Sequence, residues 1–391
     1  MRVLPEEWSD PDVFWPVLSC LYLCVMAHEI KYRPVGMVFT SSLPDVPVDV
    51  DGDYVNVRLS HRLSGTLFYE RLYPYDGRVT LCDLRSLVEE DMRARNAVTD
   101  VFLLEVSSGD DGDNYDSVQL SVLFCDRFVA AGNLESFADG NFLTTLGVRR
   151  VAPGSSFPLA MLCVGGNVPE VRISSRFRSS GDGVVRACSF PLRPAEQSSG
   201  DVCLSVDLDL ASIASAVSGL SGFADVDLLG FTVSCGQRSL DVFVDKALSR
   251  GKSFIFRNCF NFPELFQSRM VTLEKSEVSR PVAVLSSKSS FYDHTVVKTY
   301  ESETDNLGYS EAVWADQFLC SRDVSVLIPE SGGGGLLLKP VLVTSFTSDV
   351  SDGDSSLNSV KFSWRFDDNR PAVLLSVSPG VFTFQFDPVF C

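Results

Sequence analysis

Short runs in which apolar and polar residues alternate recur along most of this chain, and they restrict it to a mainly β fold. Examples are VNVRLSH, RVTLCDL, VFLLEVSS, SVQLSVLF, VCLSVDL and SLDVFVDK. Clusters rich in Gly and Asp, such as YPYDG and SGDDGDNYDS, separate the runs. Alternation places apolar side chains on one face of a strand, and Gly/Asp clusters favour tight turns. The pattern therefore predicts tandem antiparallel β-sandwich modules of an Ig-like kind.

Helical periodicity is confined to a few segments. Residues 84–96 place apolar side chains on one face, with Asp83 as the expected N-cap. The same reasoning predicts helices over 210–220 and 310–319, the latter with Ser310 as its cap.

Two stretches suggest an internal duplication. VRLSHRL (57–63) and VRISSRF (171–177) are identical at four of seven positions. Each precedes a strand that opens at a glycine (Gly77 or Gly200), a predicted helix, a leucine pair and a hairpin. The leucine pairs are Leu103–Leu104 and Leu228–Leu229. We interpret 28–130 and 158–247 as two copies of one β-sandwich module, joined by a connector over 131–157.

Two further regions flank the proposed copies. Residues 254–391 are predicted to form a third, β-rich domain with one helix, in which the SGGGG tract at 331–335 is a flexible hairpin tip. Residues 1–27 form an apolar arm whose run FWPVLSCLYLCVMA resembles an export signal. Acidic residues precede this run where export signals carry positive charge, which favours a buried strand or helix. Export remains the alternative.

Charge and cysteine content exclude several classes of partner. The formal net charge is −18, and no cluster of Lys and Arg suits a phosphate backbone, so we expect no nucleic-acid partner. The N-terminal apolar run is too short to span a bilayer, so we expect no membrane insertion. The eleven cysteines include no CxxC pair, and there are only three histidines, which argues against structural zinc. Free thiols in a reducing compartment fit this pattern.

Catalytic motifs are missing from the sequence. None of His28, His61 and His294 lies in a nucleophile elbow, and no phosphate-binding glycine loop occurs. We therefore expect no enzyme activity and no cofactor. Calcium is the one weak candidate ligand, because several carboxylates crowd one loop. These are Asp110, Asp111, Asp113 and Asp116. Their spacing does not match an EF-hand, and a solvated turn is the favoured alternative.

An aromatic cluster near one loop is the other candidate binding site. The segment FYERLYPYDG contains Phe68, Tyr69, Tyr73 and Tyr75. Exposed aromatic rings on a β-sandwich can stack on sugars, although alternation requires some of these residues to face the core.

Two segments of the third region resemble phage and prophage virion proteins of gut bacteria. FIFRNCFNFPELFQSRMVTLEK, beginning near Phe254, is similar to a strand segment of that group, and residues 300–324 are similar to its helix segment. The matching residues are Asn258, Phe260, Phe262, Pro263, Glu264 and Phe266, then Glu311, Ala312, Trp314, Phe318, Leu319, Ser321 and Val324. Asn261–Phe262 stands where that group usually has Gly. HEIKYRPVGMVFTS, beginning at His28, resembles the opening strand of such proteins.

The resemblance implies a tail or baseplate structural role and no active-site residues. We therefore expect a non-enzymatic virion component, made in the bacterial cytoplasm, that forms a homo-oligomer and docks neighbouring virion proteins. The alternative is an exported adhesin or carbohydrate-binding protein at the bacterial surface. A glycan-degrading enzyme with an unidentified carboxylate pair is a third, less favoured hypothesis.

Overall fold

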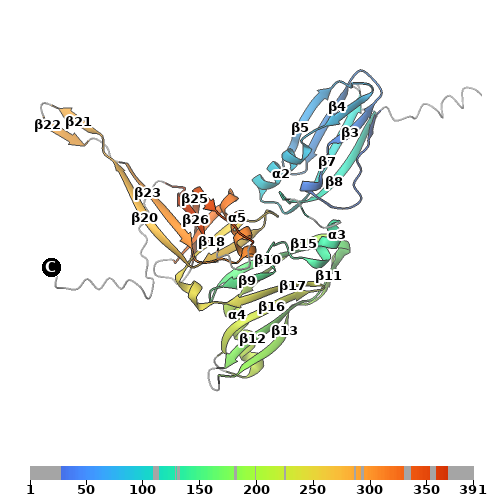
Figure 1. Ribbon diagram of the computed structural model, residues 1–391. Coiled ribbons are helices and arrows are strands. Elements are labelled where there is room, and N and C mark those ends of the chain that lie inside the picture. Colours follow the sequence, from blue (N-terminus) through green and yellow to red (C-terminus); the bar gives the residue numbers. More distant parts are fainter. Residues whose placement is uncertain are drawn as a thin grey trace, which may run out of the picture. The chain divides into compact units, whose positions relative to one another are not determined.

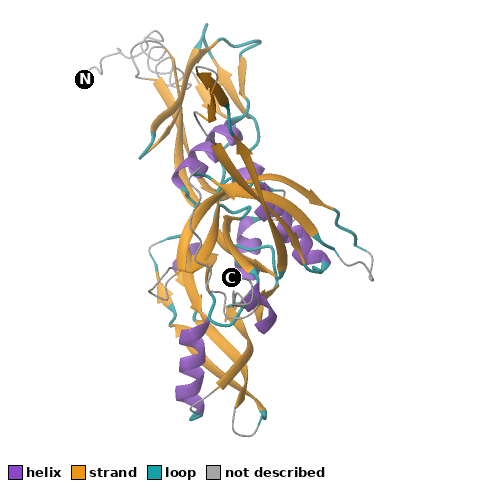
Figure 2. Ribbon diagram, turned by 90° about the vertical axis from the view of Figure 1, so that its left-hand side faces the viewer, coloured by secondary structure: helices purple, strands orange, loops and turns teal. Residues whose placement is uncertain are grey.

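The computed structural model confirms a mainly β chain. Figure 2 shows strands making up most of the part that is described. The described residues are 28–108, 114–127, 129, 133–179, 183–198, 200–223, 226–285, 288–291, 295–329, 336–352 and 358–368. The chain divides into two compact units, Met1–Val129 and Ala130–Cys391. The expected N-terminal arm and the glycine tract lie outside the described residues.

The first unit packs a three-stranded sheet against a five-stranded sheet. Their orders are β1-β3-β6 and β2-β8-β7-β4-β5, and only the β2–β8 pair is parallel. Alternate residues of β4, such as Val57 and Leu59, are buried between the sheets with Phe102 and Leu104. The elements are β1 (His28–Ile30), β2 (Val38–Phe39), β3 (Val46–Val50), β4 (Val55–His61), β5 (Gly65–Leu72), β6 (Arg78–Leu81), α2 (Leu84–Arg95), β7 (Thr99–Ser108) and β8 (Asn114–Leu123).

The N-terminal part of the second unit contains another five-stranded sheet. Its order is β13-β12-β16-β17-β9, and the β10–β15 and β11–β14 pairs accompany it. The elements are α3 (Leu134–Gly140), β9 (Val148–Val151), β10 (Ser156–Cys163), β11 (Asn167–Val168), β12 (Val171–Ser179), β13 (Val185–Arg193), β14 (Glu196–Gln197), β15 (Val202–Asp209), α4 (Leu210–Ser221), β16 (Val226–Cys235) and β17 (Arg238–Val244). Residues assigned to the connector thus form α3 and β9, and β9 joins the sheet beside β17.

The two five-stranded sheets have corresponding strand orders. Each strand of the order β2-β8-β7-β4-β5 has a counterpart at the same position of the order β9-β17-β16-β12-β13. In both sheets the short edge strand, β2 or β9, is parallel to its neighbour. VRLSHRL begins in β4 and VRISSRF lies in β12, so both stretches occupy the same place. The matched leucine pairs are not equivalent, however. Leu104 lies opposite Leu59, whereas Val233, not Leu229, lies opposite Ile173.

The C-terminal part of the second unit is a seven-stranded antiparallel sheet of order β19-β18-β24-β25-β26-β23-β20. Helix α5 packs on one face, where Phe254, Phe318 and Trp364 are buried. Beyond the sheet, the β20–β23 ladder continues into the hairpin β21–β22 (Figure 1). The elements are β18 (Lys252–Arg257), β19 (Pro263–Ser268), β20 (Met270–Ser279), β21 (Val282–Leu285), β22 (Lys288–Phe291), β23 (Thr295–Thr304), α5 (Tyr309–Cys320), β24 (Val324–Pro329), β25 (Leu336–Ser348) and β26 (Val360–Phe366).

The three predicted helices are present, Asp83 is the N-cap residue of α2 as predicted, and the predicted cap of α5 is wrong. Asp83 has a left-handed φ of 59° and makes no side-chain cap hydrogen bond to α2. Helix α5 begins after Gly308 rather than at Ser310, and the Gly308 N–H donates to Glu311 Oε2 over 3.1 Å. Helix α3 was not predicted. Its seven residues are too few to show a helical period in the sequence.

Candidate functional site

The aromatic candidates divide between core and surface. Phe68 is half-buried against the core of the first unit. Tyr69, Tyr73 and Tyr75 are 64%, 71% and 90% exposed. The Phe68 and Tyr69 side chains alternate along β5, whose pairing with β4 turns Tyr69 outward beside Arg58. Alternation therefore separates Phe68 from Tyr69, and Tyr73 and Tyr75 follow the end of β5.

Tyr54 and Arg71 extend this exposed surface. The rings of Tyr54 and Tyr73 meet edge to face, with centroids 6.5 Å apart. The Arg71 guanidinium lies 4.1 Å from the Tyr54 centroid, within cation–π range, and its Nε donates to Asn56 Oδ1 over 3.1 Å. We name Tyr54, Tyr69, Arg71, Tyr73 and Tyr75 the tyrosine surface.

Asp116, unlike the solvated turn residue expected, is buried. Its Oδ2 accepts from the Ile30 N–H over 2.9 Å and from the Arg33 guanidinium, and its Oδ1 accepts from the Ser117 N–H. Burial opposes ionisation, but the bonds from Ile30 and Arg33 outweigh it and lower the pKa of Asp116. The carboxylate thus helps join β8 to β1.

The other calcium candidates, Asp110, Asp111 and Asp113, lie outside the described residues. Within the described part of the chain, no group of three or more His, Cys, Asp or Glu side chains could hold a metal ion. The described cysteines form no disulfide. No described helix is both long and apolar enough to span a bilayer.

His61 is held on both ring nitrogens by its own fold. Nε2 lies 2.8 Å from Asp100 Oδ1, and Nδ1 accepts from the N–H groups of Leu63 and Ser64. An Nδ1 that accepts twice places the ring proton on Nε2, which donates to Asp100. His28 is buried, and its burial lowers its pKa. His294 lies outside the described residues.

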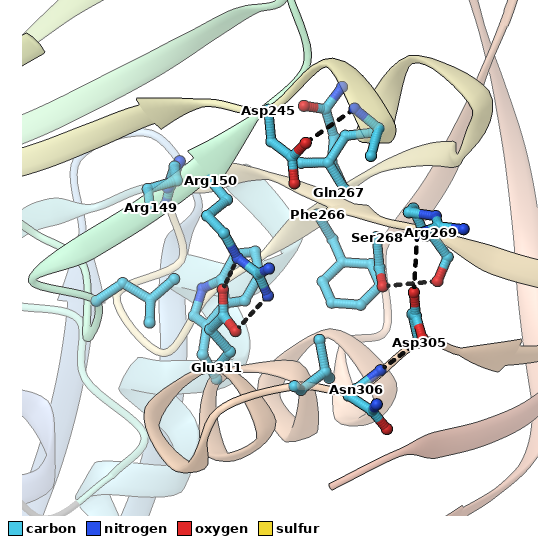
Figure 3. Close-up of a pocket in the computed structure, with 15 residues that line it drawn as sticks. Arg149, Arg150, Asp245, Phe266, Gln267, Ser268, Arg269, Asp305, Asn306 and Glu311 are labelled. Atoms are coloured by element: carbon cyan, nitrogen blue, oxygen red, sulfur yellow. Dashed lines mark hydrogen bonds and ion pairs between the residues drawn. The ribbon is translucent and has the colours of Figure 1, made fainter. Parts of the chain in front are cut away.

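A cavity of about 110 Å³ lies in the second unit where β9, β19 and the start of α5 meet. Figure 3 shows Arg150 pairing with Glu311 at its wall, through two hydrogen bonds of 2.7 Å. Arg269 and Asp305 form a second ion pair of 3.4 Å. Arg150 and Arg269 thus have carboxylate partners, whereas Arg149, which also lines the cavity, has Nε and Nη1 atoms without a hydrogen-bond partner among the described residues.

A charged cluster is buried beside this cavity. Arg149 and Glu264 are each 2% exposed and form an ion pair. Glu264 Oε2 also accepts from Trp314 Nε1 over 2.8 Å. The Arg149 guanidinium lies 4.9 Å from the Phe157 ring centroid and 5.5 Å from that of Trp314. This cluster ties β9 to β19 and α5.

The two segments that resemble virion proteins meet in this core. The Glu264–Trp314 hydrogen bond joins them, and the rings of Phe266 and Phe318 stack with centroids 4.5 Å apart. Asn261 has a φ of 57°. Asn tolerates this left-handed conformation better than most residues. The residues of these two segments with described contacts therefore serve packing and turn geometry.

One exposed apolar surface of the second unit follows the β20–β23 ladder and the β21–β22 hairpin. We call residues 270–304 the arm and residues 280–291 its tip. Val282, Val284 and Phe291 at the tip are 53%, 69% and 64% exposed. Val282 pairs with Phe291, and Val284 lies two residues along, so all three share one face of the hairpin. None of these residues was singled out in the sequence.

A groove of about 400 Å³ lies at the base of the arm, on the sheet face opposite α5. Val271 and Leu273 of β20 form one wall and are more than half exposed, and Phe346 of β25 is 45% exposed. Glu301 and Glu303 of β23 line its floor. Lys275 pairs with Glu301, and Lys361 pairs with Glu303 over 3.1 Å.

No protein-family model matches the chain, and a search of curated proteins finds no relative. Among solved structures, the chain is similar to a protein of unknown function from Porphyromonas gingivalis W83, with 16% identity and a TM-score of 0.14. That match covers 56% of this chain and 99% of the other. It is also similar to the native conformation of E. coli alpha-2-macroglobulin, with 10% identity and a TM-score of 0.19. This second match covers 85% of the chain but only 24% of the macroglobulin. Both TM-scores are too low to support an inference about function.

Proposed function

We propose that this chain is a non-enzymatic structural component of a phage tail, baseplate or tail-like particle. It acts by forming homo-oligomers and by docking neighbouring virion proteins, and it is made in the bacterial cytoplasm. The observation that carries the assembly role is the arm, which presents an apolar face to solvent. The kind of particle rests on the resemblance of 254–275 and 300–324 to phage virion proteins.

The physical argument starts from the stability of the tip. A two-stranded hairpin by itself is marginally stable in water. Among the described strands, β21 and β22 pair with each other and with no third strand. Full burial of a Val or Phe side chain stabilises by about 1.5–3 kcal/mol. Covering Val282, Val284 and Phe291 would therefore offset a large share of the ~4–15 kcal/mol that association costs.

We also propose that 28–130 and 158–247 are two Ig-like copies of one unit. The matching strand orders, the parallel edge strands and the shared place of VRLSHRL and VRISSRF support this. In each half, a helix follows the corresponding strand, β6 or β15. Repetition of one module is an economical way to extend a particle subunit.

The test is native mass spectrometry of the full-length protein in reducing buffer over a range of concentrations. We expect a defined oligomer that Val284→Asp dissociates. Val35→Asp provides the matched control, because Val35 is fully exposed in the first unit. A wild-type protein that stays monomeric at every concentration would refute the assembly role.

The second candidate function is carbohydrate binding, and the tyrosine surface favours it. Tyr73 and Tyr75 are exposed, and Tyr73 contacts Tyr54, over which the Arg71 guanidinium lies, so the surface offers ring faces to a sugar. Glycan-array binding by the wild type that Tyr73→Ala abolishes would support this function. The absence of binding to a broad array would remove it.

A further inference from the structure

We propose that the tip of one molecule seats in the groove at the base of the arm in a second copy of this chain. This inference rests on the proposed assembly function and names both the partner and the contact. The tip is formed by β21 and β22 at the far end of the arm (Figure 1), and the groove is lined by residues of β20, β23, β25 and β26 at its base.

The tip is apolar on one face and basic. Its sequence, RPVAVLSSKSSF, carries Arg280 and Lys288 and no acidic residue. The Arg280 guanidinium lies 5.8 Å from the Phe291 ring centroid, at the edge of the apolar face. The chain as a whole has a formal charge of −18. A basic segment on so acidic a protein is attracted to other copies of that protein by their overall field.

The groove combines exposed apolar residues with acidic side chains, which complement the apolar and basic residues of the tip. Val271 and Leu273 supply exposed apolar surface, and the volume of the groove, about 400 Å³, falls in the range of ligand-binding clefts. Glu301 and Glu303 are 44% and 50% exposed at their side chains. Each has one lysine partner, and a carboxylate has further lone pairs that can accept from an Arg or Lys of the tip.

The tip of a molecule cannot fill its own groove. Val271 and Val282 are eleven residues apart along the arm, which corresponds to roughly 36 Å at the rise of a strand. The β20–β23 ladder is continuous from Met270–Thr304 to Ser279–Thr295, and this ladder alone places Ser279, next to the tip, roughly 26 Å of strand from Val271. The occupant must therefore come from another molecule.

A second copy explains the features better than a membrane does. The basic, apolar tip alone would suit an anionic lipid surface, but a chain of charge −18 is repelled from one. Tip and groove are different surfaces, so each molecule inserts its tip into one neighbour and accepts the tip of another neighbour in its groove. Such a head-to-tail contact generates a ring when the rotation closes and a filament when it does not.

The experiment is charge reversal followed by mixing. The tip variant carries Arg280→Glu and Lys288→Glu, and the groove variant carries Glu301→Lys and Glu303→Lys. Arg280, Lys288 and Glu303 are exposed and Glu301 is half-buried, and circular dichroism verifies that both variants fold. The control carries Arg62→Glu and Arg322→Glu, which are exposed, line neither surface and change the net charge as the tip variant does.

We expect each variant alone to self-associate more than about tenfold more weakly than the wild type, because like charges then meet across the contact. An equimolar mixture should recover assembly, since acidic tips then meet basic grooves and basic tips meet acidic grooves. The control should assemble as the wild type does. Sedimentation velocity measures all five samples, the wild type, the two variants, their mixture and the control, in reducing buffer.

Three outcomes would overturn the inference. If the wild type assembles and both variants match it, the proposed function stands but the contact lies elsewhere. If, in addition, Phe384→Ser alone abolishes assembly, the C-terminal segment 369–391 takes the place assigned to the tip. If the wild type stays monomeric and floats with phosphatidylglycerol vesicles in a manner lost in Val284→Asp, the tip binds lipid, and the assembly function fails with the inference.

Discussion

The buried Arg149–Glu264 pair gives the most specific prediction about what holds the second unit together. Glu264→Gln keeps the shape of the side chain and an oxygen that can accept from Trp314 Nε1, but it removes the negative charge. Arg149 then remains a cation that is 2% exposed without its counter-charge. Breaking a buried pair in this way costs about 3–5 kcal/mol.

The aromatic rings beside Arg149 reduce this cost without removing it. A desolvated cation–π contact contributes about 2 kcal/mol, and Phe157 and Trp314 already provide such contacts in the wild type. We therefore expect Glu264→Gln to lower the free energy of unfolding by about 3 kcal/mol. For a unit of this size, that corresponds to a fall in Tm of roughly 6–12 °C.

A double variant and a matched control make the measurement decisive. Arg149→Met with Glu264→Gln removes both charges, keeps the acceptor for Trp314, and should recover at least about half of the loss. Glu311→Gln breaks the partly exposed pair with Arg150 and should cost less than about 1 kcal/mol. Urea unfolding followed by tryptophan fluorescence reports all three. The reasoning is refuted if Glu264→Gln unfolds at the same urea concentration as the wild type, or if the double variant is as unstable as Glu264→Gln alone.

Three further predictions concern other parts of the fold. Because the pKa of Asp116 is lowered in the folded state, the stabilisation by its carboxylate is present above pH ~4 and is lost as the pH falls below that value. Asp116→Asn should therefore lower the urea midpoint at pH 7 and make the midpoint less dependent on acidic pH. A variant whose midpoint follows the wild type at every pH would contradict this role of Asp116. Burial raises the pKa of the Cys203 thiol to about 11, so at pH 8 iodoacetamide should label Cys203 more slowly than the exposed Cys82 in peptide mass maps, and equal rates would count against that burial. A Cβ at Gly230 would lie 2.5 Å from the Val242 carbonyl oxygen, so Gly230→Ala should lower the free energy of unfolding by about 1–3 kcal/mol, and a melting curve identical to the wild type would exclude the clash.

Local pattern predicted the strands well because burial alternates along them. VNVRLSH corresponds to β4 residue for residue, with Val57 and Leu59 buried and Arg58 exposed. The same rule separates Phe68 from Tyr69. It also applies to NYDSVQLSVL, where Asp116 shares a face with Val118 and Leu120. That alternation was a signal of burial that the acidic composition of the loop obscured.

Contacts between distant segments left no comparable local trace. Arg149 and Glu264 are 115 residues apart, and nothing near either residue identifies the other. A Glu inside the apolar run FNFPELF is itself unusual, since buried acids need partners, and it could have indicated a buried pair. The arm was missed for a different reason. Apolar and polar residues alternate in the same way in a strand that lies within a sheet and in one that extends beyond it, so the sequence pattern does not distinguish the two.

The most direct test of assembly through the tip is hydrogen exchange of its backbone amides at two protein concentrations. In dilute protein, the amides of β21 and β22 should exchange quickly, because a two-stranded hairpin alone is only marginally stable. In concentrated protein they should become protected together with residues of the groove, and the protection should be lost in Val284→Asp. Exchange in β21 and β22 that does not change with concentration, while the protein remains folded, would contradict the account.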